Sequence, residues 1–222
     1  MRNLHHNIVA NVSDILLDID GVLLDGKFDN LFWEELVPLE LSLTKNISIE
    51  DAKTEIYKTA SEVKGTLPWY ELEYWEKRYA IDLLKVANAY SSKISFLPKS
   101  EKALAKLSSL NKRIILLTNC DPRLLAVKAK TVPFMKYVDG CMSAIELGTV
   151  KEKQDFWNTA FQHFQINPKE SLFADDSIGV VKSSIKAGIK NSFQVLEPTG
   201  NSSVLYLSLI HIPSPRDVEE SR

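Results

Sequence analysis

The sequence predicts an α/β fold, a doubly wound parallel sheet with a small helical cap inserted after its first strand. Short apolar runs of strand length alternate with stretches whose apolar residues recur at helical spacing. This alternation is typical of a parallel sheet whose strands are joined by right-handed helical connections. Residues 27–90 interrupt this alternation with many aromatics and few β-branched runs, which predicts the cap. Several apolar runs also end in polar residues, which predicts a polar site at one edge of the sheet.

The composition is that of an ordinary soluble globular protein. Of 222 residues, 45% are apolar and 25% are charged, and a net charge of −2 does not favour nucleic acid or an anionic membrane as partner. No apolar run reaches membrane-spanning length, and the N-terminus lacks the pattern of a signal peptide. Cys120 and Cys141 form no CxxC and are interpreted as buried apolar residues in a reducing compartment. We therefore expect a cytoplasmic protein with neither a nucleic-acid nor a membrane partner.

The first predicted strand, residues 14–19, is an apolar run that stops at two acidic residues. Asp18 and Asp20 are followed at once by Gly21, which permits a sharp change of backbone direction. Two carboxylates are then crowded at the carboxyl end of a buried strand, where they repel each other unless a cation or a proton lies between them. The same string also suits a simple turn. A calcium loop is excluded because apolar residues follow where such a loop needs a ligand and a glycine.

Three helices are predicted in the insert of residues 27–90. Apolar spacing predicts the first over residues 31–39, the second follows the expected N-cap Ser48, and the third begins near Pro68. An insert at this place in the chain lies over the strand ends, where a lid over a site would be.

Strands and helices alternate through the rest of the chain. In order, we expect a helix at 101–110, a strand at 113–119, a helix at 122–130, a strand at 137–143, a loop at 148–151 followed by a helix, a strand at 170–177, a helix at 178–187 and a strand at 191–196. The catalytic core is assigned to residues 8–26 and 91–203, and the cap to residues 27–90. The tail, residues 204–222, resembles a peptide read from a sequencing-library adapter. We interpret it as an artefact, and a genuine frayed terminus is the alternative.

Polar groups from four segments are expected at the same edge of the sheet. They are Asp18 and Asp20, Thr118 and Asn119, Lys151, and Asp175 and Asp176. The acids suit a hard cation such as Mg²⁺, while the hydroxyl, the amide and the lysine suit a phosphate. Each member alone has an ordinary structural role as a turn, a helix cap or a solvated lysine. Together, in this order, they favour a metal-dependent site that handles phosphate.

The same residues resemble the four motifs of the haloacid dehalogenase (HAD) superfamily. From about residue 8 to residue 203 the chain is also similar to the GMP/IMP nucleotidases of gammaproteobacteria within that superfamily. The narrower similarity is carried by Phe28–Trp33, Leu36–Pro38, Thr66–Tyr70, Tyr74–Trp75, Leu116–Asn119, Leu125–Lys128 and Leu172–Ser177. The resemblance implies a HAD-like, Rossmannoid core with a helical cap.

The resemblance also implies a mechanism of phosphoryl transfer. Asp18 would attack phosphorus to form an aspartyl-phosphate, and Asp20 would protonate the leaving oxygen and then deprotonate water. Mg²⁺ would be held by the Asp18 carboxylate, the Asp20 backbone carbonyl and Asp176, with Asp175 supporting or ligating directly. The groups that would hold the phosphoryl oxygens are Thr118, the Asn119 backbone and Lys151.

A second acid at the position of Asp20 is associated, within the resemblance, with phosphatases and phosphomutases rather than dehalogenases. The expected activity is that of a Mg²⁺-dependent phosphoric monoester hydrolase, a 5′-nucleotidase acting on purine nucleotides such as GMP and IMP. The alternatives are a broader phosphatase or a phosphomutase acting on sugar phosphates, and a catalytically idle binding protein. Candidate contacts to the base or ribose are Asp29, Asn30, Trp33, Trp69 and Tyr70, although these aromatics also suit packing within a helical bundle.

Overall fold

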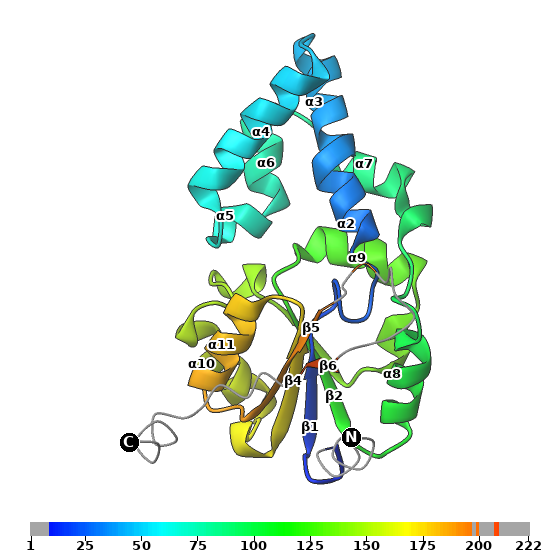
Figure 1. Ribbon diagram of the computed structural model, residues 1–222, viewed down its shortest axis with the longest axis vertical. Coiled ribbons are helices and arrows are strands. Elements are labelled where there is room, and N and C mark those ends of the chain that lie inside the picture. Colours follow the sequence, from blue (N-terminus) through cyan, green and yellow to red (C-terminus); the bar gives the residue numbers. More distant parts are fainter. Residues whose placement is uncertain (1–8, 197–198, 200–206, 209–222) are drawn as a thin grey trace.

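The computed structural model describes residues 9–196, 199 and 207–208, and it confirms the α/β fold (Figure 1). The sheet has the strand order β3-β2-β1-β4-β5-β6. The first five strands are parallel, and β6 runs antiparallel to β5. The strands are β1 (Asp14–Leu17), β2 (Arg113–Thr118), β3 (Gly140–Ser143), β4 (Ser171–Asp175), β5 (Asn191–Val195) and β6 (Leu207–Ser208).

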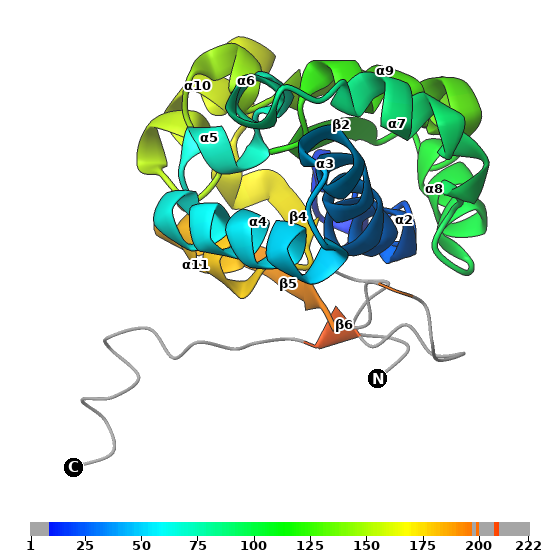
Figure 2. The same cartoon turned by 90° about the horizontal axis from the view of Figure 1, so that it is seen from above.

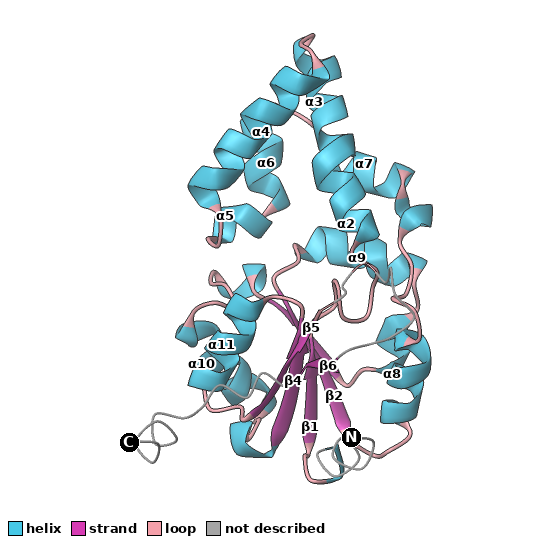
Figure 3. Cartoon of the chain, viewed as in Figure 1, coloured by secondary structure: helices cyan, strands magenta, loops and turns pink. Residues whose placement is uncertain are grey.

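Strand β1 lies at the centre of the sheet and separates two apolar cores. It pairs with β2 on one side and with β4 on the other. Because side chains alternate along a strand, Ile15 and Leu17 face one core and Leu16 faces the other. The helices that cover the first face are α8 (Ser100–Ser108) and α9 (Pro122–Thr131), and those on the second are α10 (Gln154–Phe164) and α11 (Ile178–Lys186) (Figure 3).

Three strand boundaries differ from the sequence prediction by two residues or more, and one of them is the end of β4, which lies at Asp175 rather than at residue 177. Strand β1 ends at Leu17 rather than at residue 19, because the chain turns at Gly21, whose φ is 75°, and the N–H groups of residues 22–24 donate to the Ile19 carbonyl. Strand β3 begins at Gly140 rather than at residue 137, because Phe134–Tyr137 forms a 3₁₀ helix. The other predicted core strands and helices are present, with small shifts at their ends.

A block of helices lies above the carboxyl ends of the strands, between β1 and β2 in the sequence (Figures 1 and 2). Its members are α2 (Lys27–Leu31), a π-helical turn (Phe32–Leu36), α3 (Val37–Lys45), α4 (Ile49–Val63), α5 (Leu67–Tyr70), α6 (Leu72–Tyr79) and α7 (Leu83–Ala89). We call this set the helical block, and its definition as a separate cap domain stays a prediction. Among the helices of the described residues, none has the length and apolar character needed to cross a membrane.

The first two predicted helices of the block are present, and their sequence signals are visible in the structure. The first is longer than predicted and runs without a break from Lys27 to Lys45. It contains the π-helical turn just before Pro38, a residue that has no N–H to continue the regular hydrogen bonding. The N-cap prediction for α4 is confirmed, because Ser48 Oγ accepts a hydrogen bond from the Asp51 N–H at 3.0 Å.

The third predicted helix of the block is divided. Helix α5 ends before Glu71, and α6 then begins at Leu72, whose N–H donates to the Asp121 carboxylate at 2.9 Å. This cap comes from the core rather than from a neighbouring residue. Helix α7 was not predicted, and its first turn is capped by Asp82, which accepts from the Lys85 N–H at 2.8 Å.

The predicted tail, residues 204–222, lies mostly outside the described residues. Within it, Leu207–Ser208 forms β6 and pairs with Gln194 and Val195 of β5. The interpretation of the tail as an artefact stays a prediction.

Candidate active site

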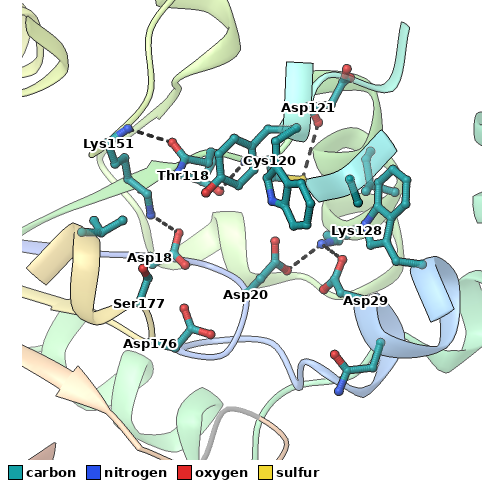
Figure 4. Close-up of a pocket in the computed structure, with 18 of the residues that line it drawn as sticks. Asp18, Asp20, Asp29, Thr118, Cys120, Asp121, Lys128, Lys151, Asp176 and Ser177 are labelled. Atoms are coloured by element: carbon teal, nitrogen blue, oxygen red, sulfur yellow. Dashed lines mark hydrogen bonds and ion pairs between the residues drawn. The ribbon is translucent and has the colours of Figure 1, made fainter. Parts of the chain in front are cut away.

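A cavity of about 430 Å³ lies between the carboxyl ends of the strands and the helical block (Figure 4). Strands β1, β2 and β4 are parallel neighbours, so the residues that follow them meet at one edge of the sheet. Every site residue predicted from the sequence lines this cavity: Asp18, Asp20, Thr118, Asn119, Lys151, Asp175 and Asp176 from the core, and Asp29, Asn30, Trp33, Trp69 and Tyr70 from the helical block.

The ammonium group of Lys151 joins two of the predicted acids. Its Nζ donates to Asp18 Oδ1 at 2.6 Å, to Asp175 Oδ2 at 2.8 Å and to the Leu117 carbonyl at 3.0 Å. The lysine side chain is only 3% exposed, so its charge is compensated by these carboxylates rather than by water. The loop before α10 thus brings its cation to the ends of β1 and β4.

Three carboxylates form a cluster that fits a hard cation. One oxygen from each of Asp18, Asp175 and Asp176 lies within 4.8 Å of the others, and an all-oxygen set is what Mg²⁺ prefers. Asp175 is already engaged, because its Oδ1 accepts from the Ser177 N–H at 2.8 Å and its Oδ2 accepts from Lys151. The geometry therefore favours Asp18 and Asp176 as ligands and Asp175 as their support.

The charges of this cluster are not balanced by the protein alone. Burial raises the pKa of Asp18 well above its usual value, and Lys151 opposes this rise while Asp175 and Asp176 increase it. Burial, followed by the charge of Asp175, raises the pKa of Asp176 to about 7. Burial alone would lower the pKa of Lys151, but Asp175 and Asp18 outweigh it and raise that pKa. Three acids around one ammonium group leave an excess of negative charge, which a divalent cation would neutralise.

The end of β2 places a hydroxyl and an amide beside the cluster. Thr118 is 1% exposed, and its Oγ1 accepts a hydrogen bond from the Cys120 N–H at 3.0 Å, so its hydroxyl hydrogen remains for a ligand. The Asn119 side chain is used internally, because Oδ1 accepts from the Lys151 N–H at 2.9 Å and Nδ2 donates to Glu152 Oε2 at 3.1 Å. For Asn119, this leaves the backbone as the group that could contact phosphate.

Lys128 is a buried member of the site that sequence reasoning missed. Its Nζ donates to Asp20 Oδ1 at 2.6 Å and to Asp29 Oδ1 at 2.8 Å (Figure 4). Burial lowers the pKa of Lys128, but the two carboxylates outweigh it and raise that pKa, while burial and Asp20 raise the pKa of Asp29 to about 6. A signal was present in the sequence, since Lys128 lies four residues after Leu124 on the apolar face of α9.

Glu152, also missed, links the helical block to the core. Its Oε1 accepts a hydrogen bond from the Tyr70 hydroxyl at 2.8 Å, while its Oε2 accepts from Asn119. Burial and the charge of Glu152 raise the pKa of Tyr70 well above its usual value, so the phenol stays protonated and donates. Nothing in the sequence distinguishes this glutamate from a surface residue.

Replacing Tyr70 by Phe is expected to lower the free energy of unfolding by about 1–3 kcal/mol, because a hydrogen bond to a carboxylate is lost while the ring stays. Urea denaturation measures this loss. Tyr57→Phe on α4 is the control, because Tyr57 is 52% exposed and its change should stay within about 0.5 kcal/mol. Equal effects of the two substitutions would contradict the link through Glu152.

The aromatic side chains of the helical block divide between packing and the cavity. Trp75 is 2% exposed, its Nε1 donates to the Trp69 carbonyl at 3.2 Å, and its ring centroid lies 5.5 Å from that of Trp33. Phe32 is also fully buried. Trp33, Trp69 and Tyr70 are only partly buried and line the cavity. Packing therefore accounts for Phe32, and also for Trp75, which borders the cavity but is almost fully buried, while the other three remain candidates for contact with a planar ligand.

Comparisons with known proteins agree with this arrangement. A family model described as haloacid dehalogenase-like hydrolase matches residues 15–188. The chain belongs to the haloacid dehalogenase-like hydrolases. This hydrolase is 30% identical over 196 residues to the GMP/IMP nucleotidase YrfG of Escherichia coli (strain K12), with 88% of each chain covered, and the same values hold for YrfG of Shigella flexneri. The resemblance inferred from the motifs is thereby confirmed.

Solved structures share the fold of this haloacid dehalogenase-like hydrolase. A HAD phosphatase from Thermococcus onnurineus matches with a TM-score of 0.73 at 17% identity, and the alignment covers 87% of this chain and 90% of that one. A dehalogenase matches with a TM-score of 0.54 at 19% identity, covering 83% and 85%. Because phosphatases and dehalogenases share the fold, the reaction has to be argued from the site residues.

Proposed function

We propose that this haloacid dehalogenase-like hydrolase is a phosphomonoesterase that acts on purine nucleoside monophosphates, with GMP and IMP as expected substrates. The observation that carries the proposal is the separation of Asp18 and Asp20. Asp18 is bound to Lys151 within the acidic cluster, whereas Asp20 is bound to Lys128. Two carboxylates in different environments suit different tasks, here those of a nucleophile and of an acid/base.

The reaction would take place in two displacements at phosphorus. In the first, a carboxylate oxygen of Asp18 bonds to phosphorus while the bond from phosphorus to the ester oxygen breaks, and Asp20 gives the leaving oxygen its proton. In the second, water attacks the aspartyl-phosphate, Asp20 accepts a proton from that water, and inorganic phosphate leaves. Both carboxyl groups are then restored to their starting states.

Three core residues would hold the phosphoryl group. The Lys151 ammonium is 2.6 Å from an oxygen of the nucleophile, where its charge can also attract phosphoryl oxygens. Thr118 and Asn119 line the same cavity, and the Thr118 hydroxyl and the Asn119 backbone N–H would donate hydrogen bonds to phosphoryl oxygens. Donors that are fixed in advance around the reacting group stabilise the charge of the transition state.

The cation site would be built by the acidic cluster. Asp18, Asp176 and the backbone carbonyl of Asp20 would hold Mg²⁺, and Asp175 would keep Lys151 and the following turn in place. When bound, Mg²⁺ neutralises negative charge and so reduces the repulsion between the phosphate and the carboxylates.

The helical block and the relatives support a nucleotide as substrate. The cavity volume of about 430 Å³ suits a small-molecule ligand. Beyond the acidic cluster, Trp33, Trp69 and Tyr70 offer aromatic surface, and Asp29 and Asn30 offer polar groups for a base or ribose. The relatives that are 30% identical over 88% of the chain are named GMP/IMP nucleotidases. A cytoplasmic enzyme remains the expectation, with the two cysteines as free thiols.

Phosphate release from a panel of esters tests the proposed function. GMP, IMP, AMP, UMP and glucose 6-phosphate are compared with Mg²⁺ present and with a chelator. We expect kcat/KM for GMP and IMP to exceed that for glucose 6-phosphate by at least about tenfold, since contacts beyond the phosphate favour the transition state of the matching substrate. Equal or better hydrolysis of the sugar phosphate would contradict the nucleotide assignment, and no release from any ester would favour a binding protein.

A further inference from the structure

A buried lysine outside the four motif segments connects the acid/base residue to the helical block. Nζ of Lys128, on α9, lies 2.6 Å from Asp20 Oδ1 and 2.8 Å from Asp29 Oδ1 (Figure 4). The lysine side chain is 1% exposed, whereas those of Asp20 and Asp29 are 27% and 25% exposed. The ammonium group is therefore almost fully covered by protein, although Lys128 lines the cavity together with both of its partners.

Lys128 fixes how Asp20 is presented to the cavity. An ammonium group taken out of water is unfavourable unless carboxylates compensate it, so Lys128 holds its partners firmly. One oxygen of Asp20 is bound to the lysine, which leaves the second oxygen for another contact. Asp20 is thereby held apart from Lys151, the cation that is bound to Asp18.

Through Asp29, Lys128 also connects the core to the helical block. Asp29 lies on α2, the first helix of the block, whereas Lys128 lies on α9 of the core and Asp20 follows β1. A shift of α2 relative to α9 therefore moves a charged partner of the ammonium group that holds Asp20.

We propose that Lys128 is a positioning residue for the acid/base step: it orients the Asp20 carboxylate toward the leaving oxygen of the substrate, and Asp29 anchors it to the helical block. The proposal deepens the proposed function and rests on the role of Asp20 in it. Lys128 touches no reacting atom in this scheme and acts through Asp20.

The leaving group distinguishes this role from a structural one. The 5′-oxygen of a nucleoside needs a proton in order to leave, whereas p-nitrophenolate leaves without one. The ratio kcat/KM covers the reaction only up to the departure of the leaving group, so later hydrolysis of the aspartyl-phosphate does not affect it. A misplaced Asp20 therefore lowers kcat/KM for GMP and spares p-nitrophenyl phosphate.

The test compares Lys128→Met with Lys130→Met, which replaces an exposed lysine on the same helix, in the full chain with Mg²⁺. We expect Lys128→Met to lower kcat/KM by about 10²-fold for GMP and by less than about threefold for p-nitrophenyl phosphate. Lys130→Met should change neither value. In an Asp20→Asn background, adding Lys128→Met should lower kcat/KM for GMP no further, because the lysine acts through that carboxylate.

Asp29→Asn removes the anchor on α2 and should give a smaller loss with the same substrate pattern. Unlike the loss of a contact to base or ribose, this loss should disappear in the Asp20→Asn background. Equal losses for the two substrates, or a further loss in the Asp20→Asn background, would overturn the proposal and leave Lys128 a structural role. Circular dichroism and thermal unfolding show whether Lys128→Met folds. If it does not, Lys128→Gln, which retains a hydrogen-bond donor, takes its place with the same expected pattern.

Failure of this proposal can be told apart from failure of the proposed function. If the parent hydrolyses another alkyl phosphate, such as glucose 6-phosphate, in preference to GMP, the purine assignment fails and the same variants are compared on that ester. If the parent cleaves GMP but Lys128→Met affects both leaving groups equally, only the role of Lys128 fails. A parent that cleaves no phosphate ester overturns both.

Discussion

Replacing Asp18 by Asn is expected to lower kcat by at least about 10⁴-fold for every phosphate ester that the parent hydrolyses, because an amide cannot form the covalent intermediate. Binding of substrate should survive, since Lys151 and Thr118 remain in place. Steady-state phosphate release measures the first effect, and equilibrium binding of GMP to the variant measures the second. Turnover at the parent rate would show that Asp18 is not the nucleophile.

The same substitution should not weaken the fold. The raised pKa of Asp18 means that folding disfavours its charged form, so a neutral side chain of the same shape relieves the crowded acids. Asp14→Asn is the matched control, because Asp14 is buried at the opposite end of β1 and bound to Arg113 Nε at 2.6 Å. That variant should lose stability and keep its kcat, the reverse of what Asp18→Asn should show.

The sheet could be predicted because each of its buried strands is recognisable from its own amino-acid sequence. Strands covered on both faces appear in the sequence as continuous apolar runs, as Arg113–Thr118 and Ser171–Asp175 show. The polar residues that follow such runs meet at one edge of a parallel sheet, whatever the details of packing. Asp18, Thr118 and Asp175 could therefore be placed together before any contact between them was known.

Contacts between the helical block and the core could not be predicted in the same way. Lys128 and Asp29 are 99 residues apart, and the Leu72 N–H and the Asp121 carboxylate are 49 apart. Such pairs depend on how two helical surfaces meet, and neither periodicity nor turn chemistry encodes that. The place of Lys128 on an apolar helix face indicates burial, but it does not indicate the partners.

The core and the helical block have different tasks in the proposed function. The core supplies the groups for the reaction, and its geometry follows from strand order. The helical block supplies Trp33, Trp69 and Tyr70, whose positions depend on contacts such as the one between Tyr70 and Glu152. We therefore expect substitutions in the block to change the ranking of substrates more than the nature of the reaction.

Replacement by Asn is expected to affect different properties at the neighbouring acids Asp175 and Asp176: Mg²⁺ affinity at Asp176 and the stability of the fold at Asp175. Asp176→Asn should raise the Mg²⁺ concentration for half-maximal activity by about tenfold or more, because it removes a carboxylate ligand. Asp175→Asn should instead lower the free energy of unfolding by about 2 kcal/mol or more. Asp175 accepts from both the Ser177 N–H and the Lys151 ammonium, and the variant keeps only part of that network.

Thermal unfolding with and without Mg²⁺ separates the two roles without using activity. A cation that binds the folded state raises Tm, so the parent and Asp175→Asn should both gain stability on addition of Mg²⁺, and Asp176→Asn should gain much less. In chelator, Asp176→Asn should be at least as stable as the parent, because burial raises the pKa of Asp176 to about 7 and its charge is disfavoured in the folded state. If Asp175→Asn lost the Mg²⁺ response and kept its stability, Asp175 would be a direct ligand. Lys151 would then be held in place by Asp18 and the Leu117 carbonyl alone.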